Sequence, residues 1–564
     1  MAVLVGGFVA TAAPVVASTD TPATETTYVV LTAVGQSLDA ARAAVETAGG
    51  TVVRVNSDIG MLTVTATNAN FADETRAGGV GGVARDRIVG EAPVDTATNR
   101  DDVEKLTAER AAARGSSHEH AKAAPADEPL ADLQWDMKMI GATSDGSYKV
   151  EPGRRAVTVG IIDTGVDGTH PDIASNFNAE LSRNFTTDIP AIDGPCEHAS
   201  CVDPNNEDDD GHGTHVAGTI AAPINGLGMA GVAPNVTIVN LRAGQDSGFF
   251  FLEPTLNALT FAGRHGIDVV NMSFYTDPWL YNCTSNPADS PAAQAEQRTI
   301  IDATTRALKF ARRNGVTLIA AAGNENTDLN FPGVDASSPD YPLDTAYPRT
   351  IDRATCLSMP SEGPGVINVS AVGPSGRKAY YSNWGINQID VSAPGGDFRD
   401  FFGTPKYRTP ENLILAPYPL NVAVANGDID PNTGESLTPF VVRDCNGDVC
   451  GLYQYIQGTS MASPHAAGVA ALVVSAHGEW MGKYKGWGME PRNVAKVLFR
   501  TATQTPCPAE NPLIYPDRPA NYNALCVGDA AYNGFYGHGI VNALAAVSGD
   551  DDHGDEGHGG EHDD

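Results

Sequence analysis

The sequence predicts an α/β domain with a doubly wound parallel sheet, preceded by a small ferredoxin-like α+β domain. Two observations support this prediction. From about residue 130 to residue 547, short apolar runs alternate with helical stretches. Residues 27–92 have a different, shorter order of elements. Strands that are apolar throughout and alternate with helices are typical of a parallel sheet covered on both faces.

The larger domain contains several strong strand signals. The predicted buried strands are residues 157–162, 236–241 and 316–321. A helix is predicted over residues 300–314, and Gly315 ends it. Residues 395–450 are rich in Pro, Asn, Asp and Gly, which indicates a long insertion.

The smaller domain has a compact β-α-β-β-α-β pattern. The expected strands are residues 27–33, 51–55, 61–66 and 83–89, and the second expected helix is 71–77. The first helix is predicted from Leu38, Ala41, Val45 and Ala48, which recur at helical spacing before Gly49. This order of elements predicts a ferredoxin-like fold.

The remaining segments have compositions that do not form a core. Residues 1–26 are expected to be a signal peptide and spacer, with a buried first strand as the alternative. Residues 93–129 indicate an exposed linker with a processing site. Residues 548–564 form an acidic, His-containing tail that we expect to be disordered, with metal binding as the alternative.

The net charge of the chain restricts its partners. The chain has 36 Lys and Arg against 69 Asp and Glu, a formal charge of -33. Such a surface repels phosphate backbones and anionic lipids, so we expect no nucleic-acid partner. No later stretch approaches the roughly 20 apolar residues of a membrane span. We expect a monomer that is secreted to the extracellular space.

The cysteine count is even, which is consistent with disulfides. Eight cysteines are present, and six of them form sequence-local pairs that leave two others: Cys196 and Cys201, Cys445 and Cys450, Cys507 and Cys526, then Cys283 and Cys356. With an export signal, this pattern favours disulfides and an oxidising compartment. Free thiols are the alternative, and the sequence does not determine the connectivity.

Three short motifs contain candidate functional side chains. Asp163 follows a predicted buried strand, at the edge where open α/β sheets form their ligand crevice; capping of a turn is the alternative. His212 stands at a Gly-flanked helix start, in DDDGHGTHVAG. His215 lies three residues further on, so the pair is also a candidate metal site, although it lacks the HExxH spacing.

Ser460 stands in the third motif, GTSMASPHAAG, at the first turn of a predicted helix. Unpaired N–H groups at a helix N-terminus stabilise negative charge near the serine oxygen. Pro464 is expected in that first turn, where its missing N–H has no intrahelical acceptor. The alternative is that Thr459 or Ser460 only caps the helix.

Together the motifs have a more specific meaning. A hydroxyl nucleophile needs a base, and a carboxylate holds an imidazole base in the correct tautomer. The chain order Asp163, His212, Ser460 is one of the known orders of a serine triad. Asn324 follows another predicted strand, in LIAAAGNEN, and can donate a hydrogen bond to an oxyanion.

The motifs DTGVDGTHPD, HGTHVAG, AAGN and GTSMASPHAAG resemble those of subtilisin-like serine proteases (subtilases) over about residues 130–547. The resemblance implies that Asp163 orients the imidazole and that His212 is the general base and acid. It likewise implies that Ser460 is the nucleophile and Asn324 the oxyanion donor. Residues 27–92 resemble the inhibitory prodomain of the family, cleaved within residues 93–133.

The resemblance also implies a structural calcium site. Its expected ligands are the side chains of Asp172 and Asn225 and the carbonyls of Pro223, Leu227 and Met229, with Gln134 as a further candidate. Hard oxygen ligands of this kind suit calcium. One feature departs from the family pattern, because Phe274 and Tyr275 stand where small residues are usual; they are expected to reshape the wall of the substrate pocket.

The sequence therefore predicts a secreted serine endopeptidase made as an autoinhibited precursor, which hydrolyses protein or peptide substrates through an acyl-enzyme. Its own prodomain is the expected inhibitor. A narrow-specificity processing protease is the alternative among enzymes. An adhesive protein or a secreted metal-binding protein that retains the fold is the alternative from another class.

Overall fold

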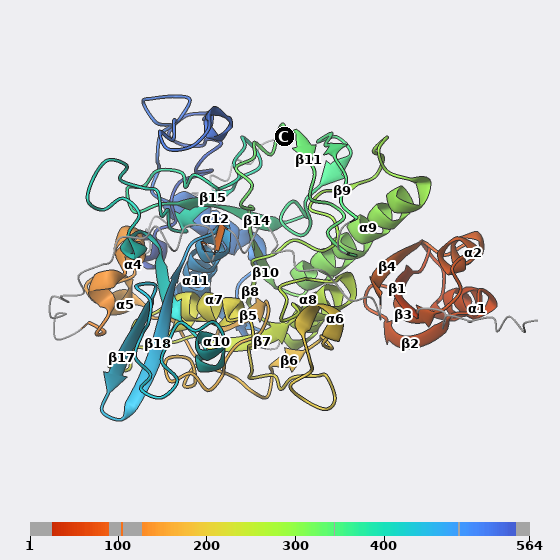
Figure 1. The fold of residues 1–564 in the computed structure, drawn as a ribbon, viewed down its shortest axis with the longest axis horizontal. Coiled ribbons are helices and arrows are strands. Elements are labelled where there is room, and N and C mark those ends of the chain that lie inside the picture. Colours follow the sequence, from red (N-terminus) through yellow and green to blue (C-terminus); the bar gives the residue numbers. More distant parts are fainter. Residues whose placement is uncertain are drawn as a thin grey trace, which may run out of the picture.

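The computed structural model describes residues 25–88, 103–104, 106, 127–342, 345–482 and 486–548. Most of the predicted signal segment, most of the linker and nearly all of the acidic tail therefore lie outside the described residues. Figure 1 shows a large α/β body with a small domain attached at one side.

The large body contains a seven-stranded sheet with the order β15-β14-β10-β8-β5-β7-β6. All of its pairings are parallel. The strands are β5 (Thr158–Ile162), β6 (Arg183–Asn184), β7 (Thr237–Arg242), β8 (Val269–Met272), β10 (Thr317–Ala321), β14 (Val366–Val372) and β15 (Val391–Pro394). Every residue of β8, β10, β14 and β15 is buried. The predicted doubly wound parallel sheet is confirmed.

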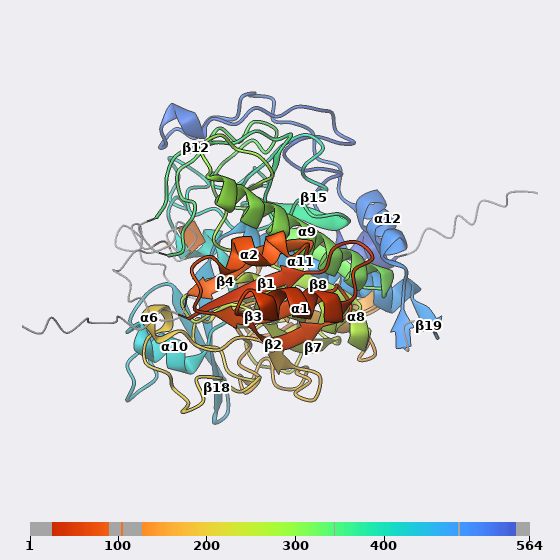
Figure 2. The same cartoon turned by 90° about the vertical axis from the view of Figure 1, so that its right-hand side faces the viewer.

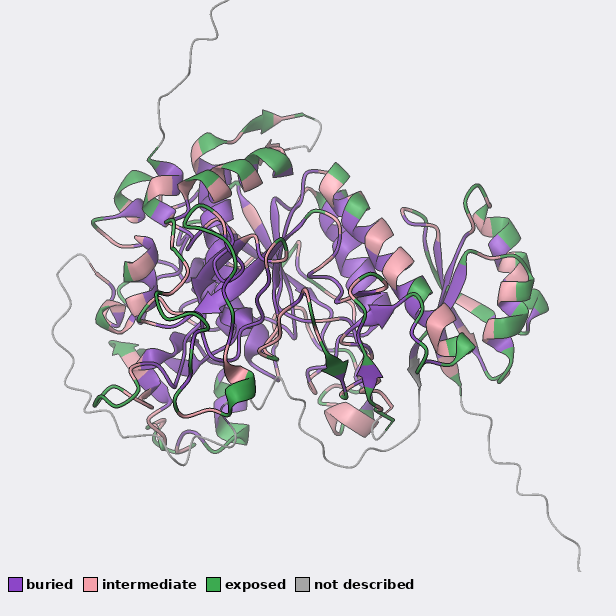
Figure 3. Ribbon diagram, turned by 90° about the horizontal axis from the view of Figure 1, so that it is seen from above, coloured by how far each residue is buried: buried purple, intermediate pink, exposed green. Residues whose placement is uncertain are grey.

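Helices cover both faces of the sheet because successive strand residues point to opposite sides. On one face, Val269 packs in a core with α7 (His212–Ala221) and α11 (Thr459–His477). On the other face, Val270 packs with α8 (Leu252–His265) and α9 (Pro291–Arg313). Figure 3 shows these central strands and helices as the buried part of the molecule.

Helix α9 begins well before the predicted residue 300. Its N-cap is Ser290, whose hydroxyl accepts from Ala293 N (3.1 Å), and Pro291 occupies the first turn. The first turns bury polar side chains such as Glu296 and Gln297, and these interrupt the hydrophobic periodicity on which the prediction rested.

Residues 395–450 contain more regular structure than the predicted insertion. They contribute to an antiparallel sheet with the order β16-β18-β17. The strands of this sheet are β16 (Ile414–Pro417), β17 (Val441–Asn446) and β18 (Val449–Ile456), and helix α10 (Leu420–Ala425) follows β16. Strand β18 leads directly into α11, so this sheet supports the segment that carries Ser460.

The small domain is an antiparallel sheet with the order β2-β3-β1-β4. Its elements are β1 (Thr26–Leu31), α1 (Leu38–Thr47), β2 (Thr51–Asn56), β3 (Met61–Ala66), α2 (Phe71–Ala77) and β4 (Gly82–Ile88). The two helices cover one face of the sheet around Val30, Val45 and Phe71. The ferredoxin-like prediction is confirmed, with the first strand ending at Leu31 rather than at residue 33.

The other face of this small sheet packs on the large body. Val29, Leu31 and Met61 share one apolar cluster with residues of α8 and α9. Figure 2 looks along this arrangement, with α1 and α2 nearest the viewer, the small sheet behind them and the large body beyond. The small domain therefore extends the second core of the large domain.

Polar contacts orient the small domain on α8 and α9. Asp86 Oδ1 accepts from Glu253 N (2.6 Å) at the first turn of α8, where a negative charge complements the helix dipole. Arg85 pairs with Glu296 of α9 (3.1 Å). Arg54 pairs with the buried Glu253 (2.5 Å).

The shorter elements complete the described chain. They are η2 (Ala131–Leu133), α4 (Trp135–Ile140), α5 (Ser147–Val150), α6 (Pro190–Asp193), β9 (Asn282–Cys283), β11 (Val334–Asp335), β12 (Arg349–Thr350), β13 (Cys356–Leu357), η3 (Pro410–Asn412), β19 (Glu479–Met481), β20 (Gly486–Gly488), α12 (Pro491–Thr501), η4 (Ala520–Tyr522) and α13 (Ala543–Val547). Among the described helices, none combines the length and the apolar character that crossing a bilayer requires.

The disulfides join the cysteines in the pairs that the sequence suggested. The bonds are Cys196–Cys201, Cys283–Cys356, Cys445–Cys450 and Cys507–Cys526. The free-thiol alternative is therefore wrong for this structure.

The buried ring of Phe71 is a sensitive point of the small domain. It is fully buried, and its centroid lies 4.8 Å from that of Tyr28. We expect Phe71→Ala to destabilise this domain by about 3–5 kcal/mol, because the large cavity it leaves cannot collapse completely. Hydrogen exchange of the β1 and β3 amides in the full chain should accelerate. Val34→Ala, at a fully exposed site, is the control; equal exchange rates in both variants would contradict this account.

Candidate active site

Asp163 lies immediately after β5, at the carboxyl edge of the parallel sheet. Its side chain is fully buried, and its Oδ1 lies 2.6 Å from His212 Nδ1. Its backbone carbonyl accepts from Ala243 N and Gly244 N, both at 3.0 Å. The end of β7 thus fixes the position of Asp163, and Asp163 in turn holds the imidazole.

His212 is the first residue of α7, and its neighbours fix the start of the helix. Gly211 adopts φ +94°, a conformation that favours glycine. Asp208 caps the turn by accepting from Gly211 N (2.9 Å) and from Thr214 N (2.9 Å). The sequence DDDGHGTH therefore orients the imidazole toward Asp163.

Ser460 lies in the first turn of α11, but neither hydroxyl there caps the helix. Thr459 Oγ1 donates to Asn324 Oδ1 (2.9 Å). The N-cap residue is Gly458, and no side chain makes a capping hydrogen bond there. Ser460 Oγ donates to Glu104 Oε1 (2.7 Å). The alternative in which Thr459 or Ser460 is only a cap is therefore wrong.

Pro464 lies inside α11 and not in its first turn, so that prediction was also wrong. A proline at this position leaves the carbonyl of Ser460 without its usual i→i−4 donor. Ser273 Oγ replaces this donor at 3.1 Å. The lost hydrogen bond is thus restored by a residue next to β8.

One carboxylate contacts three of the predicted site residues. Glu104 Oε1 accepts from Ser460 Oγ (2.7 Å) and from Asn324 Nδ2 (3.0 Å), and Oε2 lies 3.2 Å from His212 Nε2. Glu104 itself is only 2% exposed. The sequence analysis missed this residue, because the segment around it has no periodicity or motif.

Neighbouring residues anchor Glu104. Gln457 Nε2 donates to the carbonyl of Val103 (3.0 Å), and Gln457 N donates to the carbonyl of Glu104 (3.4 Å). Leu106 is buried in an apolar cluster with Phe398 and other residues of the large body. Main-chain contacts and an apolar anchor therefore hold this segment against the site.

The charge state of His212 follows from these contacts. Burial alone lowers the pKa of an imidazole, but the carboxylates of Asp163 and Glu104 outweigh burial and raise the pKa of His212 to about 10. An imidazolium between two carboxylates is the favoured state of this arrangement near neutral pH.

A cavity of about 40 Å³ opens beside Ser460 and Asn324. Phe274 and Tyr275 line it, as does Tyr281. Phe274 is held by stacking on Phe250 (centroids 4.2 Å apart). The expectation that these aromatic residues form the pocket wall agrees with their positions.

His215 is not arranged as a metal ligand. Its Nε2 lies 3.1 Å from the carbonyl oxygen of Gln454 and 3.2 Å from that of Ile414. Burial lowers the pKa of His215 to about 3, which keeps the ring neutral. The histidine pair at 212 and 215 therefore divides into one site residue and one core residue.

The predicted calcium ligands lie together but face one another as hydrogen-bond partners. Asp172 accepts from Met229 N (3.1 Å), Asn225 Nδ2 (3.0 Å) and Tyr453 Oη (3.1 Å). Asn225 Oδ1 accepts from Leu227 N (2.9 Å). In this conformation the NH2 group of Asn225 points at Asp172, so calcium at Asp172 would require the Asn225 amide to turn its Oδ1 toward the carboxylate.

The raised pKa of His212 predicts a pH-dependent stability. Folding raises the pKa of His212 from its usual 6.5 to about 10. The contribution of this imidazolium to the free energy of unfolding is therefore complete below about pH 6.5 and is lost as the pH rises through 10. Glu104→Gln removes one of the two charges, so we expect a lower pKa for His212, measured by NMR titration of the imidazole. Glu510→Gln, at an exposed site, is the control; an unchanged His212 pKa in Glu104→Gln would refute the assignment.

Comparisons with known proteins agree with this fold. The family described as "Subtilase family" matches residues 154–539. The chain is 28% identical to fervidolysin of Fervidobacterium pennivorans over 66% of this chain and 41% of that protein. It is 26% identical to subtilisin E of Bacillus subtilis (strain 168) over 57% of each. These matches therefore span only about half the length of either relative.

Solved structures show the same fold. The epidermin leader peptide processing serine protease (EpiP) of Staphylococcus aureus has a TM-score of 0.61 at 20% identity, covering 93% of this chain and 98% of EpiP. Fervidolysin, described as a keratinolytic enzyme related to subtilisin, has a TM-score of 0.55 at 22% identity, covering 94% of this chain and 62% of fervidolysin. With the family match over most of the large domain, the chain belongs to the subtilase family.

Proposed function

We propose that this protein is a serine endopeptidase made as an autoinhibited precursor. The observation that carries the proposal is the convergence of Ser460, His212 and Asn324 on one carboxylate, with Asp163 behind the imidazole. A hydroxyl, a base and an amide donor within reach of the same two oxygen atoms can act on one carbonyl group.

The proposed reaction begins when Glu104 has left the cleft. Ser460 Oγ attacks the carbonyl carbon of a peptide bond, and His212 Nε2 takes the hydroxyl proton. Asp163 holds the imidazole and stabilises its charge. The tetrahedral intermediate then collapses, the C–N bond breaks and His212 gives its proton to the leaving amine. Water, deprotonated by His212, hydrolyses the acyl-enzyme and frees Ser460.

The amide of Asn324 is already oriented for oxyanion stabilisation. Its Oδ1 accepts from Thr459 N and from Thr459 Oγ1, both at 2.9 Å. These bonds turn Nδ2 toward the cleft, where it meets the negatively charged Glu104. A donor fixed in this way acts on developing charge without having to reorganise.

In the precursor, we propose that Glu104 occupies the place of the substrate carbonyl. One oxygen of its carboxylate takes the hydrogen bonds of Ser460 and Asn324 that an oxyanion would take, and the other pairs with His212. The His212 imidazolium cannot act as a base while this pair persists. The small domain packs on α8 and α9 and belongs to the same chain as Glu104, so it helps to keep Glu104 near the cleft.

The aromatic wall of the cavity beside Ser460 limits the side chains that fit before the scissile bond. This restriction suits the alternative of a narrow-specificity processing protease, which remains open. The four disulfides favour secretion to an oxidising compartment. A non-catalytic adhesive or metal-binding role would not require Ser460, His212 and Asn324 to contact the one carboxylate of Glu104.

The role of Ser460 can be tested by covalent labelling. After removal of the small domain and linker, a fluorophosphonate probe should label Ser460, and Ser460→Ala should lose both labelling and about 10⁴-fold or more of peptide hydrolysis. Asn324→Ala should keep labelling competence but lower kcat by about 10²–10³-fold. Ser147→Ala, at a buried serine of α5, is the matched control. Labelling that persists in Ser460→Ala would eliminate this residue as the nucleophile.

The role of Glu104 can be tested in the uncleaved precursor. We expect Glu104→Ala to bind a fluorophosphonate faster than the parent chain, because the charge that pairs with His212 and blocks Asn324 is gone. Glu128→Ala, a buried glutamate near the other end of the linker, is the control. Both measurements are made with the linker intact, as checked by gel electrophoresis. Equal labelling rates for Glu104→Ala and the parent would exclude an inhibitory role.

A further inference from the structure

A group of acidic side chains gathers beside the proposed active site, between the segment that precedes His212 and the loop that follows β7. Three overlapping sets have ligand atoms that all lie within 4.8 Å of one another: His198, Asp203 and Glu207; Asp188, Glu197 and Asp246; Asp203, Asp209 and Asp246. Two atoms bound to one calcium ion at 2.3–2.6 Å are separated by no more than about 5 Å. Each set therefore meets the distance requirement for a shared ion.

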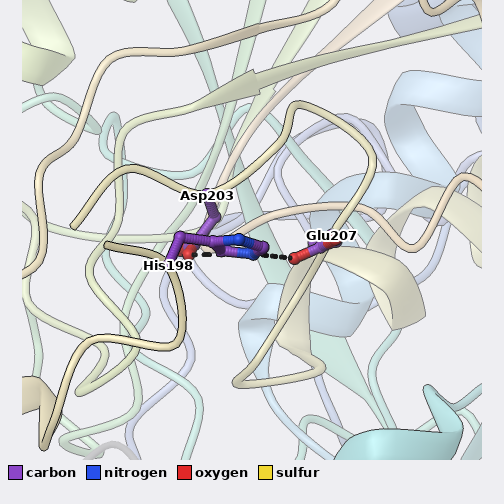
Figure 4. A group of neighbouring side chains, drawn as sticks. All are labelled: His198, Asp203 and Glu207. Carbon is purple, nitrogen blue, oxygen red and sulfur yellow. Dashed lines mark hydrogen bonds and ion pairs between the residues drawn. The ribbon is translucent and has the colours of Figure 1, made fainter. Parts of the chain in front are cut away.

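The first set is already satisfied by its own contacts. Figure 4 shows the ring of His198 between Asp203 and Glu207. Its Nε2 lies 2.7 Å from Glu207 Oε2 and 3.9 Å from Asp203 Oδ1. The contact with Glu207 raises the pKa of His198, so the ring already pairs with a carboxylate of this set.

A buried arginine neutralises part of the remaining charge. The side chain of Arg242 is fully buried; Nη1 lies 2.7 Å from Asp203 Oδ2, and Nη2 contacts Asp246 Oδ1. This one positive charge serves two carboxylates. Asp188 and Glu197 have no comparable ion pair among the described residues.

The buried side chain of Asp188 gives separate evidence that a cation binds here. It is 5% exposed, and neither of its carboxylate oxygens has a hydrogen-bond partner in the described structure. Asp246 Oδ2 is likewise buried and without a hydrogen-bond partner there. Burying a carboxylate without partners costs several kcal/mol unless a cation or a donor compensates. Both aspartates therefore have carboxylate oxygens without a partner, and both belong to one set whose ligand atoms lie within 4.8 Å of one another.

The electrostatic environment agrees with this geometry. Burial, and then the charge of Asp203, raise the pKa of Asp188 to about 6. Burial raises the pKa of Asp246 to about 8, against the opposing charge of Arg242. Burial is the main cause of both shifts, so the negative charge of each carboxylate is poorly solvated where it lies.

We propose that Asp188, Glu197 and Asp246 bind a calcium ion. The set consists of oxygen ligands only, which suits a hard cation, and Glu197 lies on the exposed side, where water can complete the coordination. The site shares no residue with the Asp172 loop. None of its three ligands contacts Ser460 or His212, so calcium binding there can be measured without relying on the proposed peptidase activity.

The site joins two segments that position the catalytic pair. Asp188 and Glu197 precede α7, and the Cys196–Cys201 disulfide closes the loop that contains Glu197. Asp246 follows β7, in the loop whose Ala243 and Gly244 amides bind the carbonyl of Asp163. Calcium would therefore connect the approach to His212 with the support of Asp163.

The test uses the full chain with Ser460→Ala, which prevents self-cleavage, stripped with EDTA and titrated with CaCl₂ by calorimetry. An added Asp172→Asn removes the other predicted calcium site from the measurement. In this background we expect a remaining calcium-binding event that Asp188→Asn and Asp246→Asn each weaken by tenfold or more, since even the loss of a partner of a metal ligand costs about 10–100-fold. Thermal unfolding midpoints should rise with CaCl₂ in the background and much less in the two variants.

Two further variants make the result decisive. Glu197→Gln changes an exposed side chain that folding does not need, so it should weaken calcium binding even if the buried variants fold poorly. Asp39→Asn, an exposed aspartate on α1, should bind calcium like the background. Absence of calcium binding in the Asp172→Asn background, or unchanged affinity in Asp188→Asn, Asp246→Asn and Glu197→Gln, would overturn the proposal.

Discussion

The contact between the buried carboxylate of Asp163 and the ring of His212 is the constraint on which the rest of the site depends. A carboxylate with no exposed surface is stable only beside a positive or donating partner, so the imidazole is held at 2.6 Å and charged. The parallel sheet provides this placement, because Asp163 ends one central strand and Ala243 follows the next. Asn324 lies in the loop that follows β10, a third strand of the same sheet. The site is thus a property of one sheet edge.

Most of the fold could be predicted because its central strands are short, largely apolar and bounded by clear breaks. The strands around Val159 and Ile319 are buried on both faces, so their sequences show uninterrupted apolar runs. The predicted helix over residues 300–314 was shorter than α9, because the buried residues Glu296 and Gln297 are polar and interrupt the apolar pattern of its first turns. The sheet formed by β16, β17 and β18 was missed because much of β17 is exposed and the surrounding sequence is dominated by turn residues. Only Gly447 and Asp448 separate β17 from β18, so Asn446-Gly447 was a local hairpin signal that the prediction did not use, whereas the pairing of β16 with β18 is long-range.

The candidate site likewise contains residues that sequence motifs identify and residues that only the structure reveals. Asp163, His212, Asn324 and Ser460 stand in motifs at strand ends or helix starts, which sequence analysis recognises. Glu104 stands in no motif, and only the folded chain brings it to within 2.7 Å of Ser460. Asp188 and Asp246 are likewise separated along the chain, and their unpartnered oxygens (both of Asp188, Oδ2 of Asp246) appear only when burial is known. Long-range juxtaposition of single polar residues was the part that the sequence could not supply.

The covalent attachment of Glu104 has a consequence for timing. While the segment belongs to the same polypeptide, its carboxylate competes for the cleft at a local concentration set by the short tether, commonly in the millimolar range for such links. Once the chain is cut between Glu104 and the large body, the same residues, still joined to the small domain, become a dissociable ligand. Its occupancy then falls as the protein spreads into a larger volume. Dilution alone would release the cleft, so a single cut made in a confined space would take effect only after dispersal.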